Sequence, residues 1–192
     1  LSAAGATQTN FAKLPDVMCK QKTTYMTIEQ LTKIEEELYA AVIEICEQTQ
    51  TTELKTQLNS IFNSYRQVHK EYANLAENDN EALKRGLFIQ WYALTEPSYL
   101  TGIGDIDAES EKIIMNIVEE RICNNNLDYE LEWMLNYYAN WDYVYDKFNG
   151  LKCVTKLVAN KKDNLFPTKI NREEMQKRGQ MGGYWNSLSR LT

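Results

Sequence analysis

Seven apolar or tyrosine residues between positions 54 and 75 follow a strict heptad pattern. The steps between them alternate between four and three residues, and the set is Leu54, Leu58, Ile61, Tyr65, Val68, Tyr72 and Leu75. Residues with this spacing share one face of an α-helix, and such a face is buried by packing against another helix. The pattern therefore predicts a helix over 52–77 inside a helical bundle.

A second helix is predicted over 27–49, just before this stripe. Thr27 and Gln30 have the spacing of a capping box, in which each side chain accepts a backbone hydrogen bond from the other residue. The apolar stripe that follows carries one charge, Glu35. A short Thr-rich break separates the two helices, so they should be antiparallel neighbours.

Further helices are expected from caps and apolar periodicity in the rest of the chain. Asn78 or Asp79 can cap a helix that ends before Pro97, because a residue that precedes proline is pushed out of the helical region. Asp107 and Asp128 can cap the two that follow. These two helices span 108–123 and 127–148. A further helix is predicted over 150–160, and a short one starts at Asn171 and is broken by Gly179, Gly182 and Gly183.

The composition agrees with this pattern. The chain has 192 residues with only eight glycines and three prolines, too few turn residues for an all-β fold. No apolar run approaches the roughly 20 residues of a transmembrane helix. We therefore expect an all-α fold, an irregular single-domain bundle of six or seven helices. Its parts are an irregular N-terminal lead-in (1–26), a helical bundle core (27–160) and a basic C-terminal segment docked on that core (161–192).

Charge is unevenly distributed along the chain. Residues 1–146 hold 11 Lys+Arg and 24 Asp+Glu, whereas residues 147–192 hold ten Lys+Arg and three acids. The favoured interpretation is that the basic segment packs on the protein's own acidic body. The alternative is attachment to a nucleic acid or a membrane surface through this segment alone, since the acidic body repels phosphate. An acidic body would also steer the chain toward a basic protein partner.

Cysteine and histidine give little sign of catalytic or metal chemistry. Cys19, Cys46, Cys123 and Cys153 are widely spaced and form no CxxC pair, so no metal site and no cofactor is predicted. We expect reduced, mostly buried thiols, although an even number leaves one or two disulfides open. His69 is the single histidine and is expected to be an ordinary residue at the core boundary.

Aromatic residues supply the candidate binding site. Residues 127–148 contain five tyrosines, two tryptophans and one phenylalanine, which predicts a central helix. One of its faces could instead line a groove for a ligand or partner, because Tyr and Trp are favoured at binding hot spots. The candidate binding residues are Trp133, Tyr137 and Trp141 on this helix, Glu96 and Tyr99 in the loop 95–104, and Tyr184 and Trp185 near the C-terminus.

The sequence favours a binding role over an enzymatic one, since it shows no catalytic motif. Our leading hypothesis is a protein-interaction or regulatory helical module with an acidic surface. The alternative is a small-ligand-binding protein or enzyme with an aromatic pocket between helices. The chain has no N-x-S/T sequon, which favours a cytoplasmic over an exported location.

Overall fold

All regular secondary structure in the described part of the chain is helical, which confirms the all-α class. The structure is a computed structural model that describes residues 26–49, 51–162, 167 and 170–189. These hold ten helical segments, more than the six or seven expected. They are α1 (Ile28–Cys46), α2 (Thr52–Leu75), α3 (Asn80–Thr95), α4 (Ser98–Thr101), α5 (Ala108–Cys123), α6 (Tyr129–Tyr138), the 3₁₀ helix η1 (Asp142–Phe148), α7 (Lys152–Ala159), α8 (Arg172–Gln176) and α9 (Gly179–Leu188).

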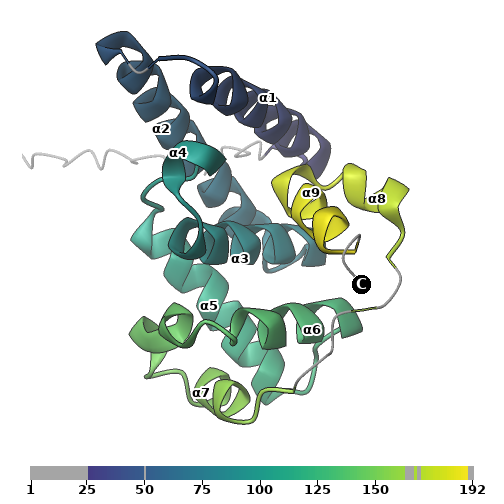
Figure 1. Cartoon of the computed structure of the whole chain (residues 1–192). Coiled ribbons are helices and arrows are strands. Elements are labelled where there is room, and N and C mark those ends of the chain that lie inside the picture. The colour runs from purple at the N-terminus through teal and green to yellow at the C-terminus, as the bar shows by residue number, and fades with distance from the viewer. Residues whose placement is uncertain (1–25, 50, 163–166, 168–169, 190–192) are drawn as a thin grey trace, which may run out of the picture.

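Helix α3 lies in the middle of the molecule (Figure 1). The α1–α2 hairpin packs on one side of it, and α5, α6 and α7 lie on the other. The C-terminal pair α8–α9 returns beside α1 and α3. Helices from both ends of the described chain therefore meet along α3. Residues 1–25 of the expected lead-in, Cys19 among them, lie outside the described residues.

The predicted helix starts are confirmed by their capping contacts. Thr27 and Gln30 form the reciprocal capping box of α1, with 2.8 Å from the Thr27 amide to Gln30 Oε1. The side chains of Asp79, Asp107 and Asp128 accept backbone hydrogen bonds at the starts of α3, α5 and α6. The heptad stripe of α2 is also inside, with Leu54, Ile61, Tyr65, Val68 and Tyr72 buried and Leu58 and Leu75 partly buried.

The predicted helix over 127–148 is wrong, because two shorter helices cover this range. α6 ends at Tyr138, and the 3₁₀ helix η1 starts at Asp142. The Asn140 side-chain amide donates to the carbonyl of Tyr137 at 3.0 Å, and the backbone at Trp141 is extended. Asparagine side chains compete in this way with the backbone bonds that would continue a helix. A short helix, α4, likewise interrupts the expected loop 95–104.

The short helix expected from Asn171 is confirmed as α8, which ends at Gln176, before Gly179. Gly182 and Gly183 do not break a helix as expected, because both lie within α9. Gly179 opens this helix with a φ of +58°. A Cβ on Gly182 would lie 1.7 Å from the carbonyl oxygen of Met175, so α8 and α9 approach through their backbones. These glycines form a tight junction between two helices.

Two cysteines differ from the expected reduced thiols. Cys123 and Cys153 form a disulfide that joins α5 to α7, with 5.6 Å between their Cα atoms. Cys46 is a free, exposed thiol. The pairing was not predictable because the two residues are separated by 30 positions and meet only when α7 packs on α5.

His69 is fully buried and does not lie at the core boundary as expected. Gln90 on α3 places its side-chain amide 3.1 Å from His69 Nε2. Burial lowers the pKa of His69 to about 4. The histidine is therefore a neutral core residue at physiological pH.

The described helices include none that is both long enough and apolar enough to cross a membrane.

Candidate functional site

A pocket of roughly 280 Å³ opens between α1, α3 and α9, and we call it the α1–α3–α9 pocket. Its walls come from both ends of the described chain. The residues that line it are Glu35, Glu36 and Tyr39 of α1, Tyr92 of α3, Gln176 of α8, and Gly179, Gln180, Gly183, Tyr184 and Ser187 of α9. The volume lies near the lower end of the usual range for small-molecule sites, about 300–1,000 Å³.

Three tyrosines supply most of the aromatic surface, one from each main helix. The rings of Tyr92 and Tyr184 pack edge to face, with centroids 5.4 Å apart and planes at 65°. Tyr39 of α1 is 42% exposed and also lines the pocket. Burial raises the pKa of Tyr92 to about 12 and raises that of Tyr184 further. Tyr92 and Tyr184 are therefore neutral. Aromatic rings such as these offer electron-rich faces.

Glu35 is a buried carboxyl group in the pocket wall, with only 1% of its surface exposed. The Tyr72 hydroxyl donates to Glu35 Oε1, and the backbone N–H of Gln180 donates to Glu35 Oε2 at 3.4 Å. Nη1 of Arg85 lies 4.0 Å from Oε1. Burial outweighs these contacts and raises the pKa of Glu35 to about 7. A carboxyl group with such a pKa in a pocket wall marks a candidate functional site.

Two glycines of α9 make room for these groups. A Cβ on Gly179 would lie within 2.8 Å of both carboxylate oxygens of Glu35, so a larger residue there would displace the acid. A Cβ on Gly183 would meet nothing within 4 Å, because this residue faces open space at the pocket. The glycines thus let the carboxylate reach α9 and keep the pocket open.

A polar network fixes α9 beneath the pocket. The side-chain amide of Gln180 donates to the carbonyl of Thr101 at 2.6 Å and to the hydroxyl of Tyr65. That hydroxyl in turn donates to the Glu35 carbonyl at 3.2 Å. Buried networks of this kind hold side chains in one arrangement when their partners are satisfied. The pocket is therefore shaped by α1, α2, α4 and α9 together.

Arg178 adds an ionic clamp next to the pocket. Its guanidinium pairs with Glu81 of α3 and with Glu130 of α6, and only 13% of its side chain is exposed. Glu81 also accepts from Arg85 at 2.7 Å. Since Arg178 reaches two helices at once, it holds the start of α9 against the body of the protein.

Other cations of residues 147–192 also pair with acids of the body. Lys147 contacts Glu111, and Lys162 lies 2.7 Å from Glu132. Together with the Arg178 pairs, these contacts favour the intramolecular interpretation of the basic segment. They leave fewer free cations for a nucleic acid or a membrane surface.

Five of the seven predicted site residues belong to an aromatic cluster around Trp91 of α3, in which Trp133 takes part through its contact with Trp185. Glu96 directly follows the last residue of α3. The ring of Trp91 on α3 lies 5.1 Å from that of Trp141 and 5.0 Å from that of Tyr184. The hydroxyls of Tyr137 and Tyr184 are 2.7 Å apart. Trp133 and Trp185 are buried, and their rings pack edge to face with centroids 4.7 Å apart. Burial raises the pKa of three nearby tyrosines, and the negative charge of Glu96 raises it further; they are Tyr92, Tyr137 and Tyr184.

Tyr99 lies apart from this group. It is 57% exposed on α4, where its carbonyl accepts from the Cys46 thiol at 3.0 Å. Of the seven predicted residues, only Tyr184 lines the α1–α3–α9 pocket. The other aromatic residues of the group mainly build the core behind it.

Sequence reasoning missed Glu35, Tyr39 and Tyr92 as candidate site residues. The usable signal was Glu35, because an isolated charge on an apolar helical stripe must be paired or neutralised when the stripe is buried. Tyr39 and Tyr92 carried no comparable signal.

Comparison with protein-family models, with curated proteins and with solved structures finds no match for this chain.

Proposed function

We propose that this chain is an interaction module that binds a cationic organic group in the α1–α3–α9 pocket. One observation carries the proposal. The described residues that line the pocket include two carboxyl groups and three tyrosine rings, and none of them is Lys, Arg or His. Alkylammonium groups are recognised by such a combination, because aromatic faces attract cations and a nearby carboxylate supplies the counter-charge.

The burial of Glu35 gives the pocket its selectivity for charge. A neutral ligand would leave this carboxyl group as it is, half-protonated near pH 7. A cation favours the ionised form and would lower its pKa. Binding of a cation is therefore coupled to release of a proton from Glu35, and affinity rises with pH up to about 8.

The cationic group could be the side chain of a basic protein partner or a free amine. A lysine or methylated lysine side chain presents an ammonium on a thin apolar stem, which suits a small apolar pocket. A free quaternary amine has the same head group. The first source corresponds to a protein-interaction module and the second to a small-ligand-binding protein.

Calorimetric titration with choline and with 3,3-dimethyl-1-butanol tests the proposal. The two molecules have nearly the same shape, but only choline carries a charge. We expect choline to bind and its neutral analogue to bind about fivefold more weakly. A single exposed cation–π contact of about 1 kcal/mol supplies that ratio. Equal affinity of the two molecules would refute recognition of charge.

Two variants locate the binding site. Gly183→Phe should fill the pocket and abolish choline binding, because its Cβ meets no neighbour. Ser64→Phe, at a position on α2 that is not part of the pocket lining, is the matched control and should bind choline normally. If Gly183→Phe binds choline as the control does, the cation does not occupy this pocket.

A third titration identifies the source of the cation. Blocked peptides that contain lysine or trimethyl-lysine are compared with choline under the same conditions. Tighter binding of a peptide indicates a protein partner, because flanking residues add contacts outside the pocket. Tighter binding of choline indicates a free amine.

A further inference from the structure

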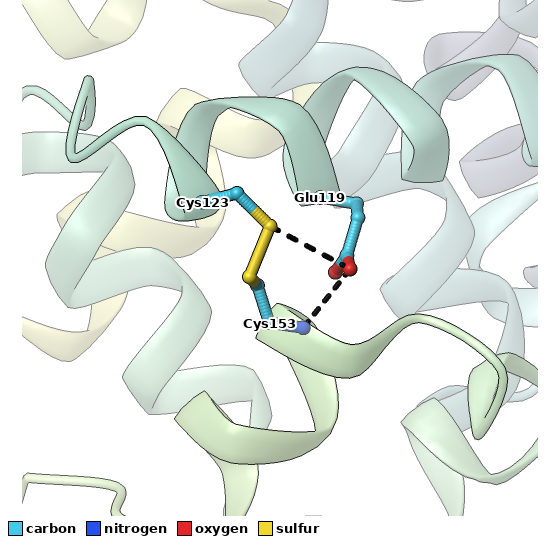
Figure 2. Close-up of side chains that lie close together, drawn as sticks. All are labelled: Glu119, Cys123 and Cys153. Atoms are coloured by element: carbon cyan, nitrogen blue, oxygen red, sulfur yellow. Dashed lines mark hydrogen bonds between the residues drawn. A yellow bond between two sulfur atoms is a disulfide. The ribbon is translucent and has the colours of Figure 1, made fainter.

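We propose that Glu119, Cys123 and Cys153 form a zinc-binding site when their disulfide is reduced. This proposal is independent of the α1–α3–α9 pocket. The three side chains come from the end of α5 and the start of α7 and point toward one another (Figure 2). One potential ligand atom from each lies within 4.8 Å of the other two. Two thiolates and a carboxylate are ligands that zinc accepts in proteins.

The distances suit a tetrahedral ion. Cys123 Sγ lies 3.7 Å from Glu119 Oε1, a contact without a shared proton, because a disulfide sulfur carries none. Zn–S bonds of about 2.3 Å and Zn–O bonds of about 2.1 Å place sulfur and oxygen roughly 3.6 Å apart on one ion. After reduction the two sulfurs need to separate to about 3.8 Å. The Cα atoms, 5.6 Å apart, can stay in place while the side chains rotate.

Glu119 is already held in the orientation that the ion requires. Its Oε1 accepts from the Cys153 amide at 2.9 Å, and its Oε2 accepts from the Val154 amide at 2.8 Å. Each carboxylate oxygen has a second lone pair that these bonds leave available. Backbone bonds that orient a metal-ligating side chain are typical of protein metal sites.

The surroundings favour negative charge and allow an ion to enter. Cys153 lies in the first turn of α7, where the positive end of the helix dipole stabilises an anion such as a thiolate. Cys123 is exposed, and both cysteines line an open cleft of roughly 560 Å³. A zinc ion and a reductant can therefore reach the sulfurs, and a water molecule can fill the fourth coordination position.

The reaction requires a dithiol reductant. The dithiol supplies two electrons and two protons, the Cys123–Cys153 bond breaks to give two thiols, and the dithiol becomes a disulfide. Zinc then displaces the two thiol protons and binds both sulfurs as thiolates. Oxidation of the same pair by a disulfide reverses these steps and releases the ion.

Zinc uptake by the full chain tests this proposal. Cys19→Ser and Cys46→Ser are introduced together, so that only the Cys123–Cys153 pair can supply thiolates. The protein is treated with dithiothreitol, freed of it by anaerobic gel filtration, and titrated with zinc against a chromophoric chelator. We expect one zinc ion per reduced chain and no uptake by the oxidised chain.

Cobalt and two matched variants identify the ligands. Co²⁺ should give a thiolate charge-transfer band in the reduced chain and none in the oxidised chain. Glu119→Gln should weaken zinc binding by about tenfold or more. Glu120→Gln, an exposed neighbour on α5, should have no effect.

Any one of four results would overturn the proposal. The reduced chain could take up no zinc, Glu119→Gln could bind as tightly as Glu120→Gln, or Cys123→Ser with Cys153→Ser could retain the site. Circular dichroism of the reduced chain accompanies each titration. A reduced chain that loses helix content and does not regain it with zinc also contradicts a preformed site.

Discussion

Gly179 lies directly against the carboxylate of Glu35, 144 positions earlier in the chain: a Cβ on the glycine would be 2.7 Å from Oε2. The φ of Gly179 is +58°, in the left-handed region. The close contact with the Glu35 carboxylate and the left-handed backbone conformation therefore both require glycine at position 179.

Gly179→Ala should consequently destabilise the protein. The left-handed conformation alone costs a non-glycine residue roughly 1–2 kcal/mol, and displacement of Glu35 adds to this. Gly183→Ala is the matched control, because its Cβ meets no atom within 4 Å. Within a helix, that change should stabilise by about 0.5–1 kcal/mol. Urea unfolding of the two variants measures the difference, and equal stabilities would contradict the packing described for Gly179.

The pH dependence of stability should carry the signature of Glu35. Its pKa is about 7 in the folded protein against an ordinary value of 4.5, so the folded state holds the proton more tightly. This stabilisation is complete below pH 4.5 and is lost as the pH rises to 7, on the order of 3 kcal/mol in total. Glu35→Gln cannot lose a proton. Its stability relative to the wild type should therefore increase over this range, whereas parallel urea-unfolding profiles would show that Glu35 titrates normally.

His69 should titrate far below the usual histidine range. Burial lowers its pKa to about 4, and the chain has no other histidine. In an untagged protein, the imidazole proton resonances can therefore be assigned to His69 directly. We expect their NMR titration midpoint near pH 4, with folding monitored in the same spectra. A midpoint near 6.5 in the folded protein would place His69 in contact with solvent.

Two cations of the basic C-terminal segment should differ widely in their effect on stability. Arg178→Gln removes the cation that Glu81 and Glu130 share in a mostly buried site, although Glu81 keeps Arg85 and Glu130 keeps Lys84. The loss of these charged hydrogen bonds should cost about 1.5–3 kcal/mol. Lys162→Gln removes a pair whose lysine side chain is 63% exposed, which should cost less than about 1 kcal/mol. Chemical denaturation measures both changes. Similar losses would contradict the clamp assigned to Arg178.

The fold class was predictable because its evidence is local in sequence. A heptad stripe such as that from Leu54 to Leu75 reports on one helix, and the caps at Thr27, Asp79 and Asp107 depend on residues three positions away. The break after Tyr138 was missed because aromatic residues continue through it. Asn140, whose side chain bonds to the backbone there, resembles any polar residue on a helix surface in the sequence.

The candidate site was less predictable because its parts meet only in the folded chain. Most of the predicted aromatic residues do gather around Trp91, but as packing partners of a core. The pocket arises where α9 reaches α1, a contact that no spacing in the sequence encodes. Glu35 was visible as an isolated charge, but its partners Tyr72 and Gln180 were not.

The large sequence separation between Glu35 and Gln180 means that their contact can form only late in synthesis of the chain. These residues are 145 positions apart. At about 5–20 residues per second, a ribosome adds Gln180 roughly 7–30 s after Glu35. The α1–α2–α3 unit has time to assemble in this interval, since its contacts are local. The newly made chain therefore exposes the Glu35 side of that unit to chaperones and proteases until α9 emerges and covers it.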